Sequence, residues 1–238
     1  MPVQIEEFQY RHEDRTLAGH LAWNPELAGP LPGVVLVHEW FGPGENVKRR
    51  ARMLAELGYV ALVADMYGVD VRPSNVGEAA VAMNDVLADR PRLRARLATA
   101  VAVLQADRRV DARRVAAIGY CFGGGCVLEL ARSGATLAGV ISFHGGLHTT
   151  LPAKATPLAK ILVLHGAEDP FVDAQKVNAF MDEMRAVHAD WQLVHYGNAV
   201  HAFTNPQAAD LAGGMCFDAK ADARSWAHMQ LFLSELFA

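Results

Sequence analysis

Cysteine, basic charge and long apolar runs are all scarce in this sequence. Its 238 residues include three cysteines, 22 basic residues and 26 acidic residues, which gives a formal net charge of −4. The cysteines follow no C-x-x-C spacing, so neither a disulfide framework nor a thiolate zinc site is expected. The small acidic excess argues against a nucleic-acid partner, because a nucleic-acid-binding surface has to be basic.

The longest apolar runs are only a few residues long. Val34–Val37 and Val60–Ala64 are far shorter than the ~20 residues that span a bilayer. The N-terminal segment Met1–Tyr10 carries Glu6 and Glu7 where a signal peptide needs an apolar stretch. We therefore expect a cytoplasmic protein that makes no contact with a membrane.

Short apolar runs alternate with longer stretches of helical period along most of the chain. The predicted strands are Gly33–His38, Tyr59–Asp65, Arg114–Tyr120, Gly139–His144, Lys160–Gly166 and Trp191–Tyr196. The predicted helices are Glu45–Leu57, Gly123–Ser133, Asp173–His188, Ala221–Phe237 and the region Val76–Gln105, which is one helix or two because it contains Pro91. Strands that are apolar on both faces lie inside a covered sheet. The alternation predicts an α/β fold with a mostly parallel central sheet and helices on both faces.

Two further strand-like runs precede this alternation. Val3–Tyr10 and Arg15–Trp23 flank the polar segment His12-Glu13-Asp14, a pattern typical of a β-hairpin. We expect this hairpin to lie antiparallel at one edge of the sheet. No repeat, low-complexity tract or change of composition divides the chain, so we predict a single domain over residues 1–238.

The segment Gly119-Tyr120-Cys121-Phe122-Gly123 places a cysteine between a predicted strand and a predicted helix. The pattern G-x-C-x-G at such a turn is that of a nucleophile elbow, whose glycines allow strand and helix backbones to approach closely. The start of the following helix favours a thiolate at Cys121, and the Phe122 N–H is suited to bind an oxyanion. The alternative is that Cys121 is a small buried apolar residue in a glycine-rich turn.

A catalytic thiol requires a base and an acid that orients the base. Asp169 follows the predicted strand Lys160–Gly166, and His201 follows the last predicted strand, Trp191–Tyr196. Nucleophile, acid and histidine thus occur in the chain order of the α/β-hydrolase triad, each beyond the carboxyl end of a parallel strand. The sequence therefore predicts the α/β-hydrolase fold and a catalytic triad that contains Cys121.

With these motifs the chain resembles the dienelactone hydrolase family, a cysteine-dependent branch of the α/β-hydrolases. The resemblance covers nearly the whole chain and rests on Gly119–Gly124, His165-Gly166-x-x-Asp169, His201-x-Phe203 and His38-Glu39-Trp40-Phe41-Gly42. It implies that Glu39 contacts the Cys121 thiol and accepts its proton when substrate arrives. It also implies that the Trp40 N–H is a second oxyanion donor beside that of Phe122.

The resemblance implies hydrolysis of a small-molecule ester or lactone through an acyl-thioester, similar to that by carboxymethylenebutenolidase, with no metal and no organic cofactor. The family's two arginines that hold a substrate carboxylate are missing from the matching stretches, Asp65–Val69 and Ala202–Asn205. Arg72 is the nearest arginine that could reach inward, but a solvated loop arginine is the favoured interpretation. We place the following residues in a largely apolar substrate pocket: Phe41, Tyr67, Arg72 and Phe203.

The remaining features have ordinary structural interpretations. The basic residues Arg90, Arg92, Arg94 and Arg96 are predicted to form a solvated helix face. The ten histidines include no H-x-H or H-E-x-x-H pair, so we expect no metal site. The functional alternatives are a non-catalytic ligand-binding protein or a redox sensor that uses Cys121. For the oligomeric state we expect a monomer or a weak homodimer.

Overall fold

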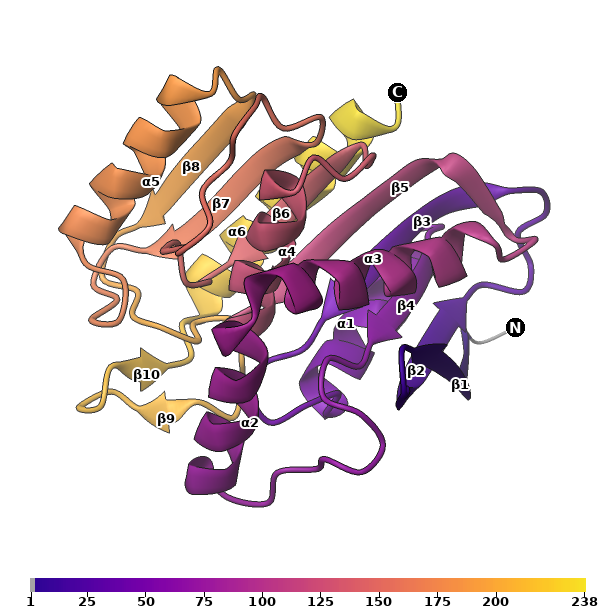
Figure 1. The fold of residues 1–238 in the computed structure, drawn as a ribbon, viewed down its shortest axis with the longest axis horizontal. Helices are drawn as coiled ribbons and strands as arrows, with labels where there is room; N and C mark the ends of the chain where they lie inside the picture. Colours follow the sequence, from indigo (N-terminus) through magenta and orange to yellow (C-terminus); the bar gives the residue numbers. More distant parts are fainter. Residues whose placement is uncertain (1–2) are drawn as a thin grey trace.

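An eight-stranded sheet runs through the middle of the molecule (Figure 1). In this computed structural model, which describes residues 3–238, the strand order is β1-β2-β4-β3-β5-β6-β7-β8. The strands are β1 (Gln4–His12), β2 (Arg15–Trp23), β3 (Leu31–Val37), β4 (Val60–Ala64), β5 (Val110–Tyr120), β6 (Gly139–Phe143), β7 (Lys160–Gly166) and β8 (Trp191–Tyr196). From β4 to β8 all neighbours are parallel, whereas β1 pairs with β2 and β2 with β4 in antiparallel register. The parallel sheet and the edge hairpin are therefore confirmed.

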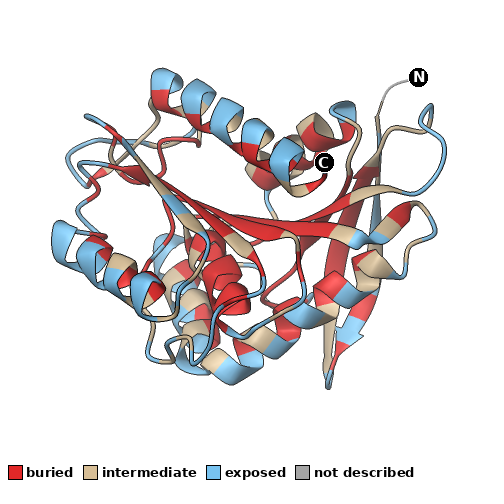
Figure 2. Ribbon diagram, turned by 90° about the horizontal axis from the view of Figure 1, so that it is seen from above, coloured by how far each residue is buried: buried red, intermediate tan, exposed pale blue. Residues whose placement is uncertain are grey.

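Helices cover both faces of this sheet, as the sequence predicted. On one face lie α1 (Glu45–Glu56) and α6 (Ala219–Leu236), and on the other lie α2 (Val76–Ala88), α3 (Arg90–Gln105), α4 (Phe122–Arg132) and α5 (Ala174–Ala186). Successive residues of β3 feed the two cores in turn: Val35 and Val37 pack under α2–α5, and Val34 and Leu36 pack under α1 and α6. Figure 2 shows the buried sheet between helices whose outer surfaces are exposed.

Polar side chains fix where the helices begin. The Asn75 carboxamide accepts the Glu78 N–H at the start of α2, and the Asp89 carboxylate accepts the Arg92 N–H at the start of α3. Asp89 also ends α2, so the region expected to be one helix or two consists of two. The break falls at Asp89, just before Pro91, because a proline is tolerated in the first turn of a helix but not in its middle.

Two parts of the sheet differ from the sequence expectation. Strand β5 begins at Val110 rather than Arg114, because Val110 pairs with Leu31 beyond an irregularity in the β3–β5 register. A two-stranded hairpin of β9 (Ala209–Asp210) and β10 (Met215–Cys216) was not predicted, since such short strands carry no periodic signal. In residues 3–238 no helix is both long enough and apolar enough to cross a membrane.

Candidate active site

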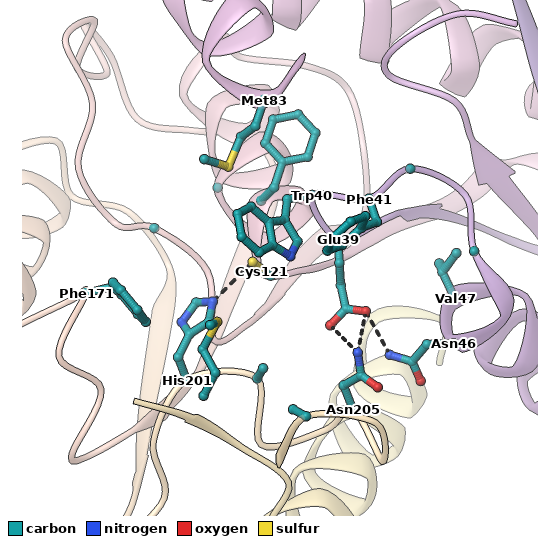
Figure 3. Close-up of a pocket in the computed structure, with 18 of the residues that line it drawn as sticks. Glu39, Trp40, Phe41, Asn46, Val47, Met83, Cys121, Phe171, His201 and Asn205 are labelled. Carbon is teal, nitrogen blue, oxygen red and sulfur yellow. Dashed lines mark hydrogen bonds between the residues drawn. The ribbon is translucent and has the colours of Figure 1, made fainter. Parts of the chain in front are cut away.

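Cys121 lies at the turn between β5 and α4. Its φ of 55° is in the left-handed region, which costs energy for a residue with a side chain and is typical of functional sites. The strained turn is held from behind by the end of β6, because the Cys121 N–H donates to the Phe143 carbonyl at 3.0 Å and to His144 Nδ1 at 3.1 Å. The side chain of Cys121 faces the cavity drawn in Figure 3.

Two glycines make this turn possible. A Cβ atom on Gly119 would lie 1.9 Å from the Gly123 carbonyl oxygen, and one on Gly123 would lie 2.3 Å from the Val37 carbonyl oxygen. Both obstacles are backbone atoms, which cannot move aside as a flexible side chain can. The close approach of strand and helix that the G-x-C-x-G pattern predicted is therefore present.

The structure brings Cys121, His201 and Asp169 together, although they are far apart in the sequence. His201 Nε2 lies 3.1 Å from the Cys121 sulfur, and His201 Nδ1 donates to Asp169 Oδ2 at 2.7 Å. Asp169 is buried, and its other oxygen accepts the Phe171 N–H at 2.9 Å. This chain of contacts fixes the orientation of the imidazole and directs Nε2 at the sulfur.

His201 is held by the hairpin that the sequence did not reveal. Its N–H donates to the Gly214 carbonyl at 3.0 Å, and its carbonyl accepts the Cys216 N–H at 3.1 Å. The loop after β7 is tied to the loop after β8 in a similar way, since the Glu168 N–H donates to the Ala199 carbonyl at 3.0 Å. The β9–β10 hairpin and these loops thus place His201 beside Asp169.

The charges at this site favour a protonated histidine. Burial by itself lowers the pKa of His201, but the negative charge of a Cys121 thiolate, the hydrogen bond to Asp169 and the Asp169 charge together raise the pKa of His201 to about 10. The 3.1 Å between His201 Nε2 and the Cys121 sulfur is short enough for a proton to pass between the two groups.

Two backbone N–H groups beside Cys121 are free to bind an oxyanion. Among the hydrogen bonds within residues 3–238, neither the Trp40 nor the Phe122 N–H has an acceptor. The loop that carries Trp40 is fixed, because the Tyr67 hydroxyl donates to the Trp40 carbonyl at 2.8 Å and His38 Nδ1 donates to the Glu39 carbonyl at 2.6 Å. The two expected donors thus lie on rigid backbone that lines the same cavity as Cys121.

The expected contact between Glu39 and the Cys121 thiol is not present. The Glu39 carboxylate accepts hydrogen bonds from Asn46 Nδ2 at 3.2 Å and from Asn205 Nδ2 at 3.0 Å, and it points away from the sulfur (Figure 3). Burial raises the pKa of Glu39, and the two amides oppose that shift. The carboxylate turns to the amides because they satisfy its oxygens, which leaves His201 as the partner of the thiol.

A cavity of about 760 Å³ opens in front of Cys121. Most of the side chains around it are apolar, and they come from the β3–α1 loop, α2, the start of α4, the loop after β7 and the β9–β10 hairpin. The large apolar ones are Trp40, Phe41, Met83, Leu87, Phe122, Phe171, Val172 and Met215. His201 and Glu39 are among the polar side chains that line it. A small, mostly apolar molecule fits such a site.

Of the four residues expected in the substrate pocket, only Phe41 lines this cavity. Tyr67 lies behind it, with its ring against His38 and Phe122. Phe203 is fully buried in the core against His144. Both corrections have the same reason, since a sequence does not show which side of a loop an aromatic ring packs on.

Arg72 also lies outside the cavity. Its guanidinium donates to the buried Asp65 carboxylate at 2.9 Å and to the Gly68 carbonyl. Asp65 in turn accepts the N–H groups of Ala18, Tyr67 and Gly68. The placement of Arg72 in the substrate pocket was therefore wrong, and Arg72 does not take the place of the missing substrate arginines, because its guanidinium pairs with a buried carboxylate.

Three residues of this site were missed at the level of the sequence. Asn46 and Asn205 hold Glu39, and the only available signal was their position shortly after the motif residues, Asn46 in the first turn of α1 and Asn205 in a loop. His144 is fully buried behind Cys121, and its Nε2 donates to Thr204 Oγ1 at 2.8 Å, since its Nδ1 accepts the Cys121 N–H. His144 directly follows β6, and its position beyond the carboxyl end of a parallel strand could have identified it as a site residue.

No cluster of three or more His, Cys, Asp or Glu side chains in residues 3–238 is arranged to hold a metal ion. Cys126 is buried in α4, and Cys216 lies in β10. All three cysteines are free thiols.

Comparisons with known proteins identify the family of this chain. The model of the dienelactone hydrolase family matches residues 18–237. A solved dienelactone hydrolase-like promiscuous phosphotriesterase from metagenomic libraries is 40% identical, with 100% of both chains covered and a TM-score of 0.95. A probable 2-oxo-3-(5-oxofuran-2-ylidene)propanoate lactonase from a Bradyrhizobium species is 30% identical over 75% of this chain and 76% of its own length. A Yersinia pestis protein assigned as a carboxymethylenebutenolidase is 27% identical over 79% of this chain and 74% of its own. The family match spans almost the whole sequence, and this protein therefore belongs to the dienelactone hydrolase family and is a hydrolase of esters or lactones.

Proposed function

We propose that this protein hydrolyses a small-molecule ester or lactone with Cys121 as nucleophile, His201 as general acid and base, and Asp169 as the group that orients His201. The observation that carries the proposal is the chain of contacts at 3.1 Å and 2.7 Å that joins the three side chains at the mouth of an apolar cavity. Such a constellation is the general requirement for covalent acyl transfer.

In the first step the Cys121 thiolate attacks the carbonyl carbon, and a bond forms between the sulfur and that carbon. The carbonyl oxygen becomes an oxyanion that the Trp40 and Phe122 N–H groups stabilise; each such donor contributes about 3 kcal/mol in related enzymes. When the tetrahedral intermediate collapses, the C–O bond to the leaving group breaks. The imidazolium Nε2–H of His201 gives its proton to the departing alkoxide, which leaves an acyl-thioester and a neutral histidine.

In the second step water replaces the alcohol. Neutral His201 takes a proton from the water through Nε2 while the oxygen attacks the thioester carbon, and the C–S bond then breaks. The products are the carboxylic acid and the regenerated Cys121–His201 ion pair. Asp169 keeps Nδ1 protonated throughout, so Nε2 remains the only nitrogen that exchanges protons.

The proposal is tested by Cys121→Ser with a panel of 4-nitrophenyl esters and simple enol lactones. We expect kcat to fall at least about 1,000-fold, because serine is a far weaker nucleophile beside a histidine arranged for a thiolate. Cys216→Ser is the matched control, since Cys216 does not line the cavity, and it is expected to stay within about twofold of the wild type. Mass spectrometry of a slow ester with the wild type should show an acyl group on the Cys121 peptide. Equal rates in the wild type and Cys121→Ser would remove the assignment and leave a ligand-binding or redox role.

A second activity, hydrolysis of neutral phosphotriesters, is favoured by the similarity to the phosphotriesterase at 40% identity. In the same apolar cavity the Cys121 sulfur would attack phosphorus and the P–O bond to the aryloxide would break; water that gives a proton to His201 would then attack phosphorus and break the P–S bond, which releases the dialkyl phosphate and the thiolate. The measurement is release of 4-nitrophenolate from diethyl 4-nitrophenyl phosphate. Release by the wild type that disappears in Cys121→Ser supports this activity, and no release above the buffer rate rejects it.

A further inference from the structure

Arg90, the first residue of α3, lines the cavity that contains Cys121 and His201. We expected from the sequence that Arg90 would share a solvated helix face with three other arginines, and this expectation was wrong. The side chain is partly buried, and its Nε is buried without a hydrogen-bond partner. A cation therefore lies on the wall of an otherwise largely apolar cavity.

The other arginines of α3 are all engaged. Arg92 pairs with Glu13 at 2.8 Å, Arg94 pairs with Glu129 at 2.8 Å, and Arg96 donates to the Met66 carbonyl. For the Arg90 guanidinium, residues 3–238 supply neither an ion pair nor a hydrogen bond. Arg90 alone among the four lacks a partner in the part of the chain that the structure describes, and a partly desolvated charge without a partner is costly unless a bound ligand provides an oppositely charged group.

The three carboxylates that line the cavity also have hydrogen-bond or ion-pair partners other than Arg90. Glu39 is bonded to two asparagine amides, Glu45 pairs with Arg52 at 3.5 Å, and Asp210 accepts the Gly213 N–H at 2.8 Å. None of the three forms an ion pair with Arg90. The positive charge of Arg90 is thus not cancelled by the lining of the cavity.

Arg90 lies close to the first turns of α4, beyond the nucleophile. Burial raises the pKa of the Cys126 thiol, and the nearby charge of Arg90 is the largest influence that opposes this shift. Gly125, the residue before Cys126, and Gly146, which lies against it, also line the cavity, and a Cβ added to Gly146 would meet nothing within 4 Å. This end of the cavity therefore combines an unpaired cation with open space.

We propose that Arg90 forms an anion-binding subsite, so that the preferred substrates carry a carboxylate or phosphate group remote from the scissile bond. This inference rests on the proposed function and defines the substrate class of the same site. A guanidinium suits the task, because its planar array of donors binds two oxygens of a carboxylate or phosphate at once. The anion would dock at Arg90 while the apolar chain between it and the ester lies along Met83 and Leu87.

The catalytic test compares 4-nitrophenyl hexanoate with the 4-nitrophenyl monoester of adipate, whose acyl chains have the same number of carbons. In Arg90→Met we expect kcat/KM for the anionic ester to fall about 30-fold or more, and kcat/KM for the neutral ester to change less than about threefold. Arg90→Lys should recover part of the preference, because lysine keeps the charge but loses the two-point contact. Arg92→Met is the matched control and should leave both values unchanged.

A binding test separates this inference from the failure of the proposed chemistry. Titration calorimetry of Cys121→Ser with adipate and with inorganic phosphate should show binding that Arg90→Met in the same background weakens at least about tenfold. Loss of adipate binding alone assigns a carboxylate, and loss of phosphate binding alone assigns a phosphate. If Cys121→Ser retains full esterase activity but Arg90→Met loses anion binding, the mechanism fails and the subsite stands. Equal binding with and without Arg90, or no binding of either anion, overturns the subsite.

Discussion

Two neighbours of His201, Asp169 and Cys121, both raise the pKa of its imidazole against the effect of burial. Asp169 holds Nδ1–H at 2.7 Å, and the Cys121 sulfur lies 3.1 Å from Nε2. Behind them His144 is fully buried and accepts the Cys121 N–H, and burial lowers the pKa of His144 well below its ordinary value. One histidine thus stays neutral to position the nucleophile's backbone, and the other carries the proton of the reaction.

The charge of His201 gives a prediction for pH dependence. The pKa of His201 is raised from 6.5 to about 10, so the imidazolium should persist through neutral pH. Because the folded-state value is the higher one, its contribution to stability is complete below about pH 6.5 and is lost as pH rises through about 10. We expect kcat/KM to stay level from pH 7 to about pH 9 and to fall near pH 10.

The same residue can be followed directly by NMR of its imidazole nitrogens. In Cys121→Ser the negative charge beside Nε2 is gone, so His201 should lose its proton at a clearly lower pH than in the wild type. Far-UV circular dichroism of the variant serves as the control for folding. Identical titrations of His201 in the two proteins would show that no thiolate–imidazolium pair exists.

At the scale of elements, the position of the nucleophile depends on how closely β5, α4 and β3 pack. Gly119 touches the backbone of Gly123, and Gly123 touches the backbone of Val37 at the end of β3. We expect Gly119→Ala and Gly123→Ala each to cost about 3 kcal/mol or more, because the added methyl overlaps main-chain atoms. For a chain of this length that cost lowers Tm by roughly 6–12 °C.

The matched control for these variants is Gly197→Ala. A Cβ at Gly197 meets nothing within 4 Å, and its loop follows the edge strand β8. Thermal unfolding followed by circular dichroism should place Gly197→Ala within about 1 °C of the wild type. If Gly119→Ala matched the control in both Tm and ester hydrolysis, the close packing of the elbow would not be what positions Cys121.

At the scale of the whole molecule, periodicity alone predicts the sheet and the two helical layers. Strands β7 and β8 were predicted to the residue; β7 is an apolar run that ends in a glycine, and the mixed run of β8 is bounded by Asp190 and Gly197. The order of Cys121, Asp169 and His201 was also readable, since parallel strands bring their carboxyl ends to one edge.

What the sequence does not contain is the direction of individual side chains in loops. Phe203 turns into the core and Arg72 turns to Asp65, and both belong to loop segments without period. Arg90, in the first turn of α3, lines the cavity instead of facing solvent with the rest of its predicted surface. Glu39 bonds to the amides of Asn46 and of Asn205, which lies 166 residues along the chain, rather than to the Cys121 sulfur. These choices depend on which partner is closest in three dimensions, so only the assembled fold decides them.

The final prediction concerns whether the chain unfolds as a single unit. Both cores share the same strands: Leu62 of β4 packs under α2–α5, and Val63 packs on the opposite side. Removal of either helical layer would expose one face of every central strand, so neither layer is expected to persist without the other.

Tryptophan side chains lie on both sides of the sheet, with Trp23 and Trp191 against the core under α2–α5 and Trp226 against the core under α1 and α6. We expect far-UV circular dichroism and tryptophan fluorescence to give one urea midpoint, in the wild type and in Trp226→Phe, whose remaining signal comes from the α2–α5 side. Two separated transitions, or a shift between the two signals, would instead show that the two layers unfold independently and that residues 1–238 are not a single cooperative domain.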